Sequence, residues 1–222
     1  MQSEPFKLFL SGPAGSGKTE VAQTLESLHG FRRIGLGDLC RAEARRRGWP
    51  EDRFHLQAAG DAMRAGNPAR LAALALAQGR TVRGPVVIEG VRLVAEATYL
   101  RAHGVIGVAV EAPEHLRVAR LRARDGSSVL PTHATEREAA SLPADLRIQN
   151  DHEDRDALRR QVRVTVGRAV MLQAERRGQV QGLALSPAGL AAMRRHGDDL
   201  DRIARSGRSA RRTSRDRAGL ER

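Results

Sequence analysis

The chain has 222 residues and a formal net charge of +12, with 41% hydrophobic and 29% charged residues. This length allows one substantial core, and the balance is typical of a globular rather than a disordered chain. The single cysteine excludes a disulfide framework and a thiolate metal cluster. No apolar run reaches the length of a membrane span, and residues 6–10 are too short for a signal peptide, so we expect a cytoplasmic protein without membrane partners.

The positive charge comes almost entirely from arginine, because only Lys7 and Lys18 are lysines among 38 basic residues. Together with abundant alanine, this bias is typical of GC-rich coding, which raises arginine content regardless of function. The charge is spread along the chain instead of gathering on a recognisable module, and aromatic residues are only 3% of the total. Nucleic-acid binding as the main role is therefore disfavoured.

The hydrophobic pattern predicts strands alternating with helices along most of the chain. In chain order we expect strand 6–10, a glycine loop and a helix ending near Gly30, strand 31–36, helices at 39–48 and 53–79 with a break at 66–68, strand 85–90, a helix to about 103, strand 105–112, helix 113–124, strand 146–151 and a helix to about 177. This alternation is typical of an α/β fold: a doubly wound parallel sheet of about five strands with helices on both faces.

The chain becomes polar after this pattern ends, with Gly, Ser and Arg in "RSGRSARRTSRDR" at 205–217. Such a segment has little apolar surface to bury. We therefore expect a domain at 1–177 and a basic, mobile tail at 178–222. Nucleic acid could be a partner only through this tail, and the oligomeric state is left open.

The segment "GPAGSGKT" matches the pattern G-x-x-x-x-G-K-[ST] in full and stands between a predicted strand and a predicted helix. Backbone N–H groups of such a loop form an anion nest, and the N-terminus of the following helix adds its positive dipole end. The lysine reaches the β- and γ-phosphates, and the threonine hydroxyl takes a place on Mg²⁺. The predicted nucleotide-binding residues are Gly12, Pro13, Ala14, Gly15, Ser16, Gly17, Lys18 and Thr19.

A phosphate-binding loop alone does not name a reaction. The chain has no N-K-x-D or T-K-x-D element for guanine and no LSGGQ-like segment of a transport ATPase. Its length disfavours a ring-forming ATPase with a helical lid domain. A small kinase that uses ATP and Mg²⁺ is the class that is left.

Further segments resemble the nucleoside monophosphate kinases of the adenylate kinase type. "GDLCR" at 37–41 is similar to the family's Gly-Asp-x-x-Arg, in which the arginine grips the acceptor's phosphate, and this implies that role for Arg41. "VVIEGVR" at 86–92 is similar to the family's strand ending in acid-Gly-x-x-Arg, shortened by one residue. It looks closer to the Asp-Gly-x-Arg of deoxynucleotide kinases and dephospho-coenzyme A kinase-like proteins. The resemblance places Arg92 at the acceptor phosphate and Glu89 near Mg²⁺.

The resemblance continues to about residue 170. "ARLRARDG" at 119–126 looks like the Arg-x-x-x-Arg that leads into the family's mobile lid, which implies ATP binding for Arg120, a catalytic role for Arg124 and a short lid at about 125–144. Arg117 and Arg122 are alternatives for these two positions. "ADLRIQND" at 144–151 is similar to the last strand and its Asn turn near the base, which gives Asn150. Catalytic roles then fall to Lys18, Arg92 and Arg124.

The acceptor is left open by these residues. A phosphate acceptor is already anionic and needs arginines, for which Arg41, Arg92 and also Arg64 are candidates. A hydroxyl acceptor needs a carboxylate base, for which Asp38 is the candidate. We therefore expect a nucleoside or deoxynucleoside monophosphate kinase, with a dephospho-coenzyme A kinase-like enzyme as the alternative. A third hypothesis is an ATP-binding regulatory or RNA-associated protein that uses the tail.

Overall fold

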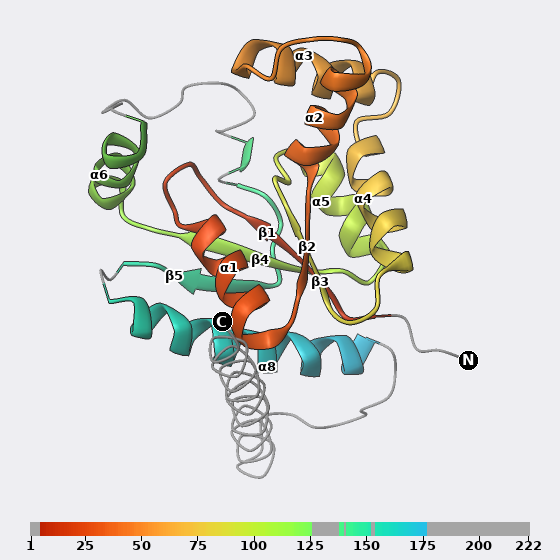
Figure 1. The fold of residues 1–222 in the computed structure, drawn as a ribbon. Coiled ribbons are helices and arrows are strands. Elements are labelled where there is room, and N and C mark those ends of the chain that lie inside the picture. The colour runs from red at the N-terminus through yellow and green to blue at the C-terminus, as the bar shows by residue number, and fades with distance from the viewer. Residues whose placement is uncertain (1–4, 126–137, 140, 152–153, 177–222) are drawn as a thin grey trace, which may run out of the picture.

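The structure is a computed structural model that describes residues 5–125, 138–139, 141–151 and 154–176, with only the backbone at 124–125. Five parallel strands form one sheet in the order β2-β3-β1-β4-β5. Their bounds are β1 Lys7–Ser11, β2 Arg32–Gly35, β3 Val86–Glu89, β4 Ile106–Glu111 and β5 Leu146–Gln149. The expected α/β fold with a doubly wound parallel sheet is confirmed (Figure 1).

The three inner strands are buried on both faces, which explains their continuous apolar sequences. Every residue of β1 is buried, and β3 and β4 are buried up to their terminal glutamates. Of the edge strands, β2 exposes Arg32 and Arg33 and β5 exposes Arg147 and Gln149, and each strand buries one isoleucine, Ile34 or Ile148. Burial thus follows the position of each strand in the sheet.

Helices α1 (Lys18–His29) and α8 (Arg155–Arg176) cover one face of the sheet (Figure 1). Val21 and Leu25 of α1 pack with Val162 and Val166 of α8 against side chains from all three inner strands. Helix α1 ends where Gly30 adopts a left-handed φ of 66° and donates its N–H to the Leu25 carbonyl. This is the glycine C-cap that the sequence predicts.

The other face carries α2 (Leu36–Arg46), α3 (Arg53–Arg64), α4 (Arg70–Thr81) and α5 (Val94–Ala102). Their buried side chains join one core cluster with Phe9, Ile34, Val86 and Ile88 of the sheet. Helix α3 begins at the N-cap Asp52, whose side chain accepts a hydrogen bond from the backbone N–H of His55 at 2.9 Å. The remaining described helix, α6 (Glu114–Asp125), follows β4.

The predicted elements are all present among the described residues, and their bounds differ by a few positions. The clearest difference is at α2, which begins at Leu36 directly after Gly35, so the predicted strand 31–36 is shorter and the helix starts earlier. Most of the expected lid, 125–144, and the whole tail, 178–222, lie outside the described residues. In the part of the chain that is described, no helix is long and apolar enough to cross a membrane.

Asp145 connects three elements just before β5. Its Oδ1 accepts hydrogen bonds from Arg101 Nη2 of α5 at 2.7 Å and Arg176 Nη2 of α8 at 2.6 Å, and its Oδ2 accepts one from the Gly107 N–H at 2.8 Å. Burial alone would raise the pKa of this carboxyl, whose side chain is 3% exposed, but these donors outweigh burial and lower it from its ordinary 3.8. The ionised form therefore stabilises the fold.

We predict that Asp145→Asn lowers the free energy of unfolding by about 1–3 kcal/mol at neutral pH, because it removes the charge that both guanidiniums contact. Since the pKa of Asp145 is lower in the folded state, its contribution is present above the ordinary value and is lost as the pH falls through the folded value. The gap in melting temperature between wild type and variant should therefore narrow below about pH 4.

The matched control for this measurement is Glu51→Gln, which breaks an exposed ion pair with Arg45 and should change stability by at most about 0.5 kcal/mol. A gap for Asp145→Asn that stays constant from neutral to acid pH would contradict the assigned role of the charge.

Candidate functional site

The phosphate-binding loop lies at the carboxyl end of β1, between the strand and α1. Lys18 Nζ donates to the carbonyl oxygens of Gly12 at 2.8 Å and Pro13 at 2.7 Å, so the ammonium lies across the loop. The N-cap of α1 is Gly17, which has a left-handed φ of 94° and provides no side-chain cap. The N–H groups of the first helical turn are thereby left for an anion.

Two glycines of the loop leave no room for a side chain, Gly12 because of the β4 backbone and Gly17 because of the Asn150 side chain. A Cβ on Gly12 would stand 2.1 Å from the Val110 carbonyl oxygen of β4, and one on Gly17 would stand 2.1 Å from Asn150 Nδ2. Both also have a positive φ, which side chains disfavour. The loop is consequently fitted against β4 and the segment after β5.

Asn150 and Arg120 support this loop from outside. Asn150, only 3% exposed, donates from Nδ2 to the Ser16 carbonyl at 2.9 Å. Arg120 on α6 donates to the Gly15 carbonyl at 3.4 Å and to the Asn150 carbonyl at 3.2 Å. The sequence predicts both residues near ATP, and in the structure both contact the phosphate-binding loop. The Asn150 amide is buried and its hydrogen bond goes to the loop backbone. Arg124 lies on the last turn of α6, and its side chain is outside the described residues.

Glu89 lies at the carboxyl end of β3, the strand that pairs with the loop-bearing β1. Because residues alternate along a strand, it shares the face of Val87, which packs with α1. Burial raises the pKa of Glu89, and Arg33 opposes this by donating to Oε2 at 3.2 Å; the Lys18 charge also acts to lower the pKa.

Thr19 is exposed in the first turn of α1. The described residues contain no group of three or more His, Cys, Asp or Glu side chains that could hold a metal ion. A Mg²⁺ ion held through Thr19 and Glu89 would therefore need phosphate oxygens and water as further ligands, which is how this ion usually binds nucleotides.

The acceptor candidates converge on the turn between β3 and α5. The first residues of α2 pack against Gly90, where a Cβ would stand 3.5 Å from Leu36 Cβ and 3.6 Å from the Gly37 nitrogen. This brings "GDLCR" beside "EGVR". The charges of Arg64, Arg92 and Arg41 all act on the buried Cys40 thiol, whose pKa is raised mainly by burial. Arg64 is joined to this turn directly, because Glu96 accepts hydrogen bonds from Arg64 Nε and from the backbone N–H of Arg92.

The arginines differ in how they are held. Arg41 Nη1 donates to Asp38 Oδ1 at 2.6 Å, and both side chains are about half exposed, at 46% and 65%. Arg64 is only 17% exposed and is paired with the fully buried Glu96 at 2.9 Å. Arg92 is exposed at the start of the turn that leads into α5.

Sequence reasoning missed Glu96 and Arg33. Glu96 takes the N3 position of a helix capping box, but the N-cap is Leu93, whose side chain cannot accept a hydrogen bond, so the sequence lacks the Ser, Thr, Asp or Asn that would have signalled the box. Arg33 carries no signal, because its partner Glu89 is 56 residues away.

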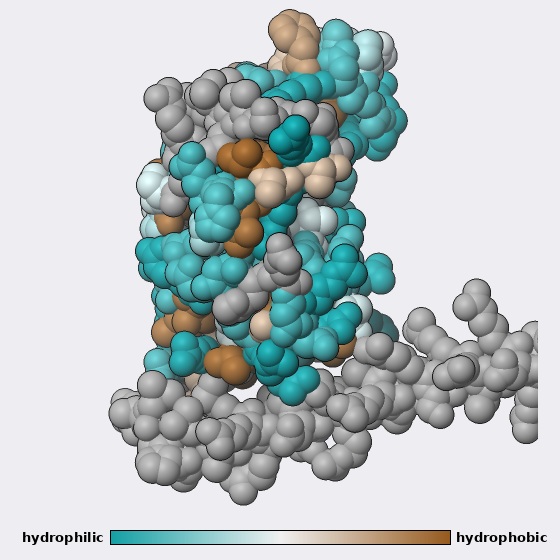
Figure 2. Space-filling view, turned by 90° about the vertical axis from the view of Figure 1, so that its left-hand side faces the viewer, coloured by the Kyte–Doolittle hydropathy of each residue, from teal (hydrophilic) through white to brown (hydrophobic). Residues whose placement is uncertain are grey.

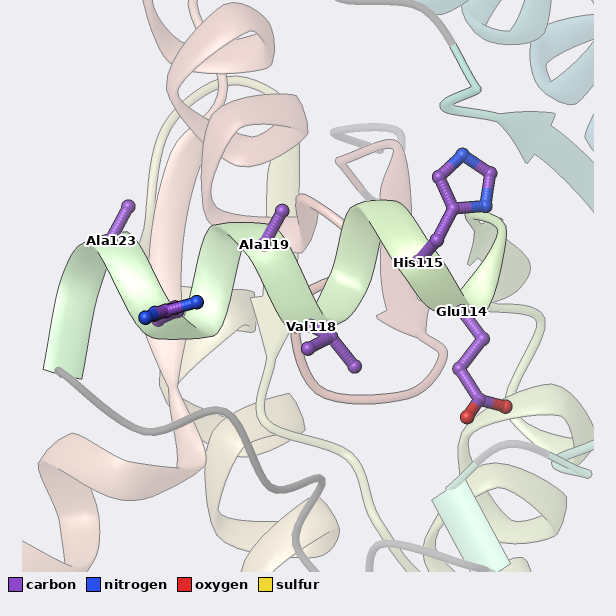
Figure 3. A pocket seen from close by; sticks show the side chains of 6 residues that line it. Glu114, His115, Val118, Ala119 and Ala123 are labelled. Atoms are coloured by element: carbon purple, nitrogen blue, oxygen red, sulfur yellow. The ribbon is translucent and has the colours of Figure 1, made fainter.

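A hollow of about 880 Å³ lies against α6 and is separate from this site. Its described lining comes from one helix, namely Glu114, His115, Val118, Ala119, Arg122 and Ala123 (Figure 3). At 100° per residue these positions lie on the side of α6 opposite Arg117 and Arg120, which face the loop. On the described part of the molecular face that Figure 2 shows, hydrophilic residues predominate and hydrophobic ones form small separate groups.

The glycine loop on β1, its lysine and the uncapped N-terminus of α1 define a P-loop nucleotide-binding α/β protein. Residues 8–141 match the model of the AAA domain family. This match covers more than half of the chain, and the chain belongs to that family. No curated protein matches the sequence.

Solved structures resemble this chain. TT1252 from Thermus thermophilus is 21% identical with a TM-score of 0.52, over 74% of this chain and 98% of that one. A gluconokinase from Sinorhizobium meliloti 1021 is 16% identical with a TM-score of 0.49, over 80% of this chain and 99% of that one. A shikimate kinase from Acinetobacter baumannii is 16% identical with a TM-score of 0.47, over 75% and 94%. At 21% identity the similarity to TT1252 concerns the fold alone.

We predict that Gly17→Ala weakens binding of a nucleoside triphosphate at least about tenfold, because the new Cβ would displace Asn150 from the loop. Gly104→Ala is the matched control: its φ of 75° is also positive, but no atom lies within 4 Å of its Cβ position. Calorimetric titration should show near wild-type affinity for the control. If both variants lose nucleotide affinity equally, the cause is the strain of a side chain at positive φ and not the displacement of Asn150.

Proposed function

We propose that this protein is an ATP-dependent phosphotransferase that acts on a nucleoside or deoxynucleoside monophosphate. The observation that carries the proposal is geometric: Glu96 accepts hydrogen bonds from both Arg64 and the backbone N–H of Arg92, and the start of the α2 segment that carries Arg41 packs against Gly90 in the same turn after β3. Neighbouring β1 carries the phosphate-binding loop. Two anion-binding groups on adjacent parallel strands suit a donor and an acceptor that both carry phosphate.

The donor half would hold ATP with Mg²⁺. Loop N–H groups and the N-terminus of α1 bind the phosphates, while Thr19 and Glu89 contribute to the metal site. Lys18 exchanges its bonds to the Gly12 and Pro13 carbonyls for bonds to phosphate oxygens. Since the transition state of phosphoryl transfer spreads negative charge over the transferred group, Lys18, Arg92 and Arg124 stabilise it by position and charge.

The proposal also assigns roles to the domain, the lid segment and the tail. Residues 1–177 form the catalytic domain, and about 125–144 form a short lid that excludes water after ATP and acceptor have bound. The basic segment 178–222 is a separate tail and the one place where nucleic acid would bind. With ATP and a nucleotide as substrates, the proposed place of action is the cytoplasm.

A hydroxyl-directed small-molecule kinase is the second candidate. Asp38 favours it, because this carboxylate is 65% exposed at the start of α2 and is held by Arg41 at 2.6 Å. A carboxylate so placed could accept the proton of an attacking hydroxyl group.

Initial rates of ATP consumption should be measured with nucleoside monophosphates, nucleosides and dephospho-coenzyme A as acceptors. Turnover with a monophosphate supports the proposal. Turnover with a nucleoside or dephospho-coenzyme A supports the second candidate. ATP hydrolysis that no acceptor accelerates contradicts both and favours an ATPase.

We predict that Lys18→Ala lowers turnover by several powers of ten and leaves the fold intact, because the backbone nest of the loop does not depend on this side chain. Lys18→Arg tests geometry at constant charge, and it too should be strongly impaired since a planar guanidinium replaces a compact ammonium. Circular dichroism checks folding. Phosphoryl transfer at the wild-type rate by folded Lys18→Ala would refute the kinase proposal.

We predict that Arg92→Ala raises the acceptor KM far more than the ATP KM. The loss of an arginine–phosphate contact costs about 2–5 kcal/mol when the partner charge stays buried. Arg159→Ala, which removes an exposed arginine paired with Asp156 on α8, is the control and should leave both values unchanged. A fall in ATP affinity with an unchanged acceptor KM would place Arg92 on the donor side.

A further inference from the structure

Glu96 is a fully buried carboxylate in the first turn of α5. Its Oε2 accepts hydrogen bonds from the backbone N–H groups of Arg92 at 3.0 Å and Leu93 at 3.2 Å. Its Oε1 accepts one from Arg64 Nε at 2.9 Å and lies 2.9 Å from Arg64 Nη2. One carboxylate thus contacts both the guanidinium of Arg64 and the backbone that carries Arg92.

The capping contacts alone do not require a charge. A neutral glutamine could accept the two backbone hydrogen bonds through its carbonyl oxygen. Burial of an ionised carboxylate is unfavourable unless the charge is paired and hydrogen-bonded. The charge of Glu96 is therefore accounted for by Arg64, which lies on another helix, α3, and is its ion-pair partner.

Arg64 is confined in turn by its own helix. It crosses Gly60, one turn earlier, at a position where a Cβ would stand 2.9 Å from Arg64 Nη1 and 3.3 Å from Cys40 Sγ. The absence of a side chain at Gly60 leaves room for the guanidinium close to Cys40 of α2 and Glu96 of α5. With 17% of the side chain exposed, few alternative rotamers are accessible.

From this arrangement we propose that Glu96 is a positioning residue for the acceptor's phosphate: it fixes the Arg64 guanidinium and the backbone of Arg92 in one arrangement before the acceptor binds. The inference rests on the proposed function in taking Arg64 and Arg92 as acceptor ligands. Pre-organised arginines lose less side-chain entropy on binding an anion, so affinity rises without a new contact. Glu96 touches no reacting atom in this role.

The test uses the full chain with a non-hydrolysable ATP analogue and Mg²⁺ filling the loop, and inorganic phosphate as the probe. Melting temperature against phosphate concentration yields an apparent Kd for each variant, because a ligand that binds the folded state raises its stability by mass action. Glu96→Gln should raise the Kd for phosphate at least tenfold while the affinity for the ATP analogue changes less than twofold. Glu43→Gln removes a carboxylate of α2 that pairs with Arg46 and Arg47 and not with the arginines of the proposed site; it is the control and should change neither value.

A double-mutant cycle separates positioning from capping. If Glu96 acts through Arg64, Arg64→Ala and the double variant Arg64→Ala/Glu96→Gln should bind phosphate equally weakly. The double variant should also melt higher than Arg64→Ala, since it no longer buries an unpaired carboxylate. If Arg64→Ala does not fold, Arg64→Lys replaces it, keeping the charge and losing the planar fork.

Two results would overturn the inference: wild-type phosphate affinity in folded Glu96→Gln, or no phosphate binding by the wild-type protein. Failure of the proposed function is a separate result. A wild-type protein that binds phosphate in a Glu96-dependent way but transfers no phosphate to any acceptor would refute the function and leave the anion site in place.

Discussion

The parallel pairing of β1 with β3 on one side and β4 on the other is the constraint on which the site depends. Parallel strands share a direction, so the loops after all of them leave from one edge of the sheet. That edge brings the phosphate loop after β1 next to Glu89 at the end of β3. It also brings α6, which follows β4, against the other side of the loop (Figure 1).

At two glycines of the loop, neighbouring atoms lie so close that a side chain would not fit. The loop backbone at Gly12 meets β4, and Gly17 meets Asn150 after β5. Close contacts of this kind restrict the loop backbone before a ligand is present, and a restricted loop loses less entropy on binding. In the proposed acceptor half the anion-binding groups are arginine side chains instead of backbone N–H groups. Carboxylates hold Arg41 and Arg64 in place.

Some of the chain's many arginines have a structural role, because they pair with buried carboxylates. Asp145 and Glu96 are each nearly inaccessible, and each is contacted by at least one guanidinium and one backbone N–H. Asp145 joins α5, α8 and β4 away from the loop, whereas Glu96 lies among the acceptor candidates. The same pairing chemistry therefore serves stability at one position and, in our proposal, ligand geometry at the other.

The sequence by itself determined the order of strands and helices, the phosphate loop and the arginine-bearing segments "GDLCR" and "EGVR". These are local properties, since periodicity and glycine spacing act over a few residues of backbone. Only the tertiary structure decided that Glu96 pairs with Arg64, 32 residues away, and that Asn150 bonds the Ser16 carbonyl across 134 residues. Such pairs depend on how the helices cross and on which strands are neighbours in the sheet. Neither can be inferred from the residues next to a side chain in the sequence.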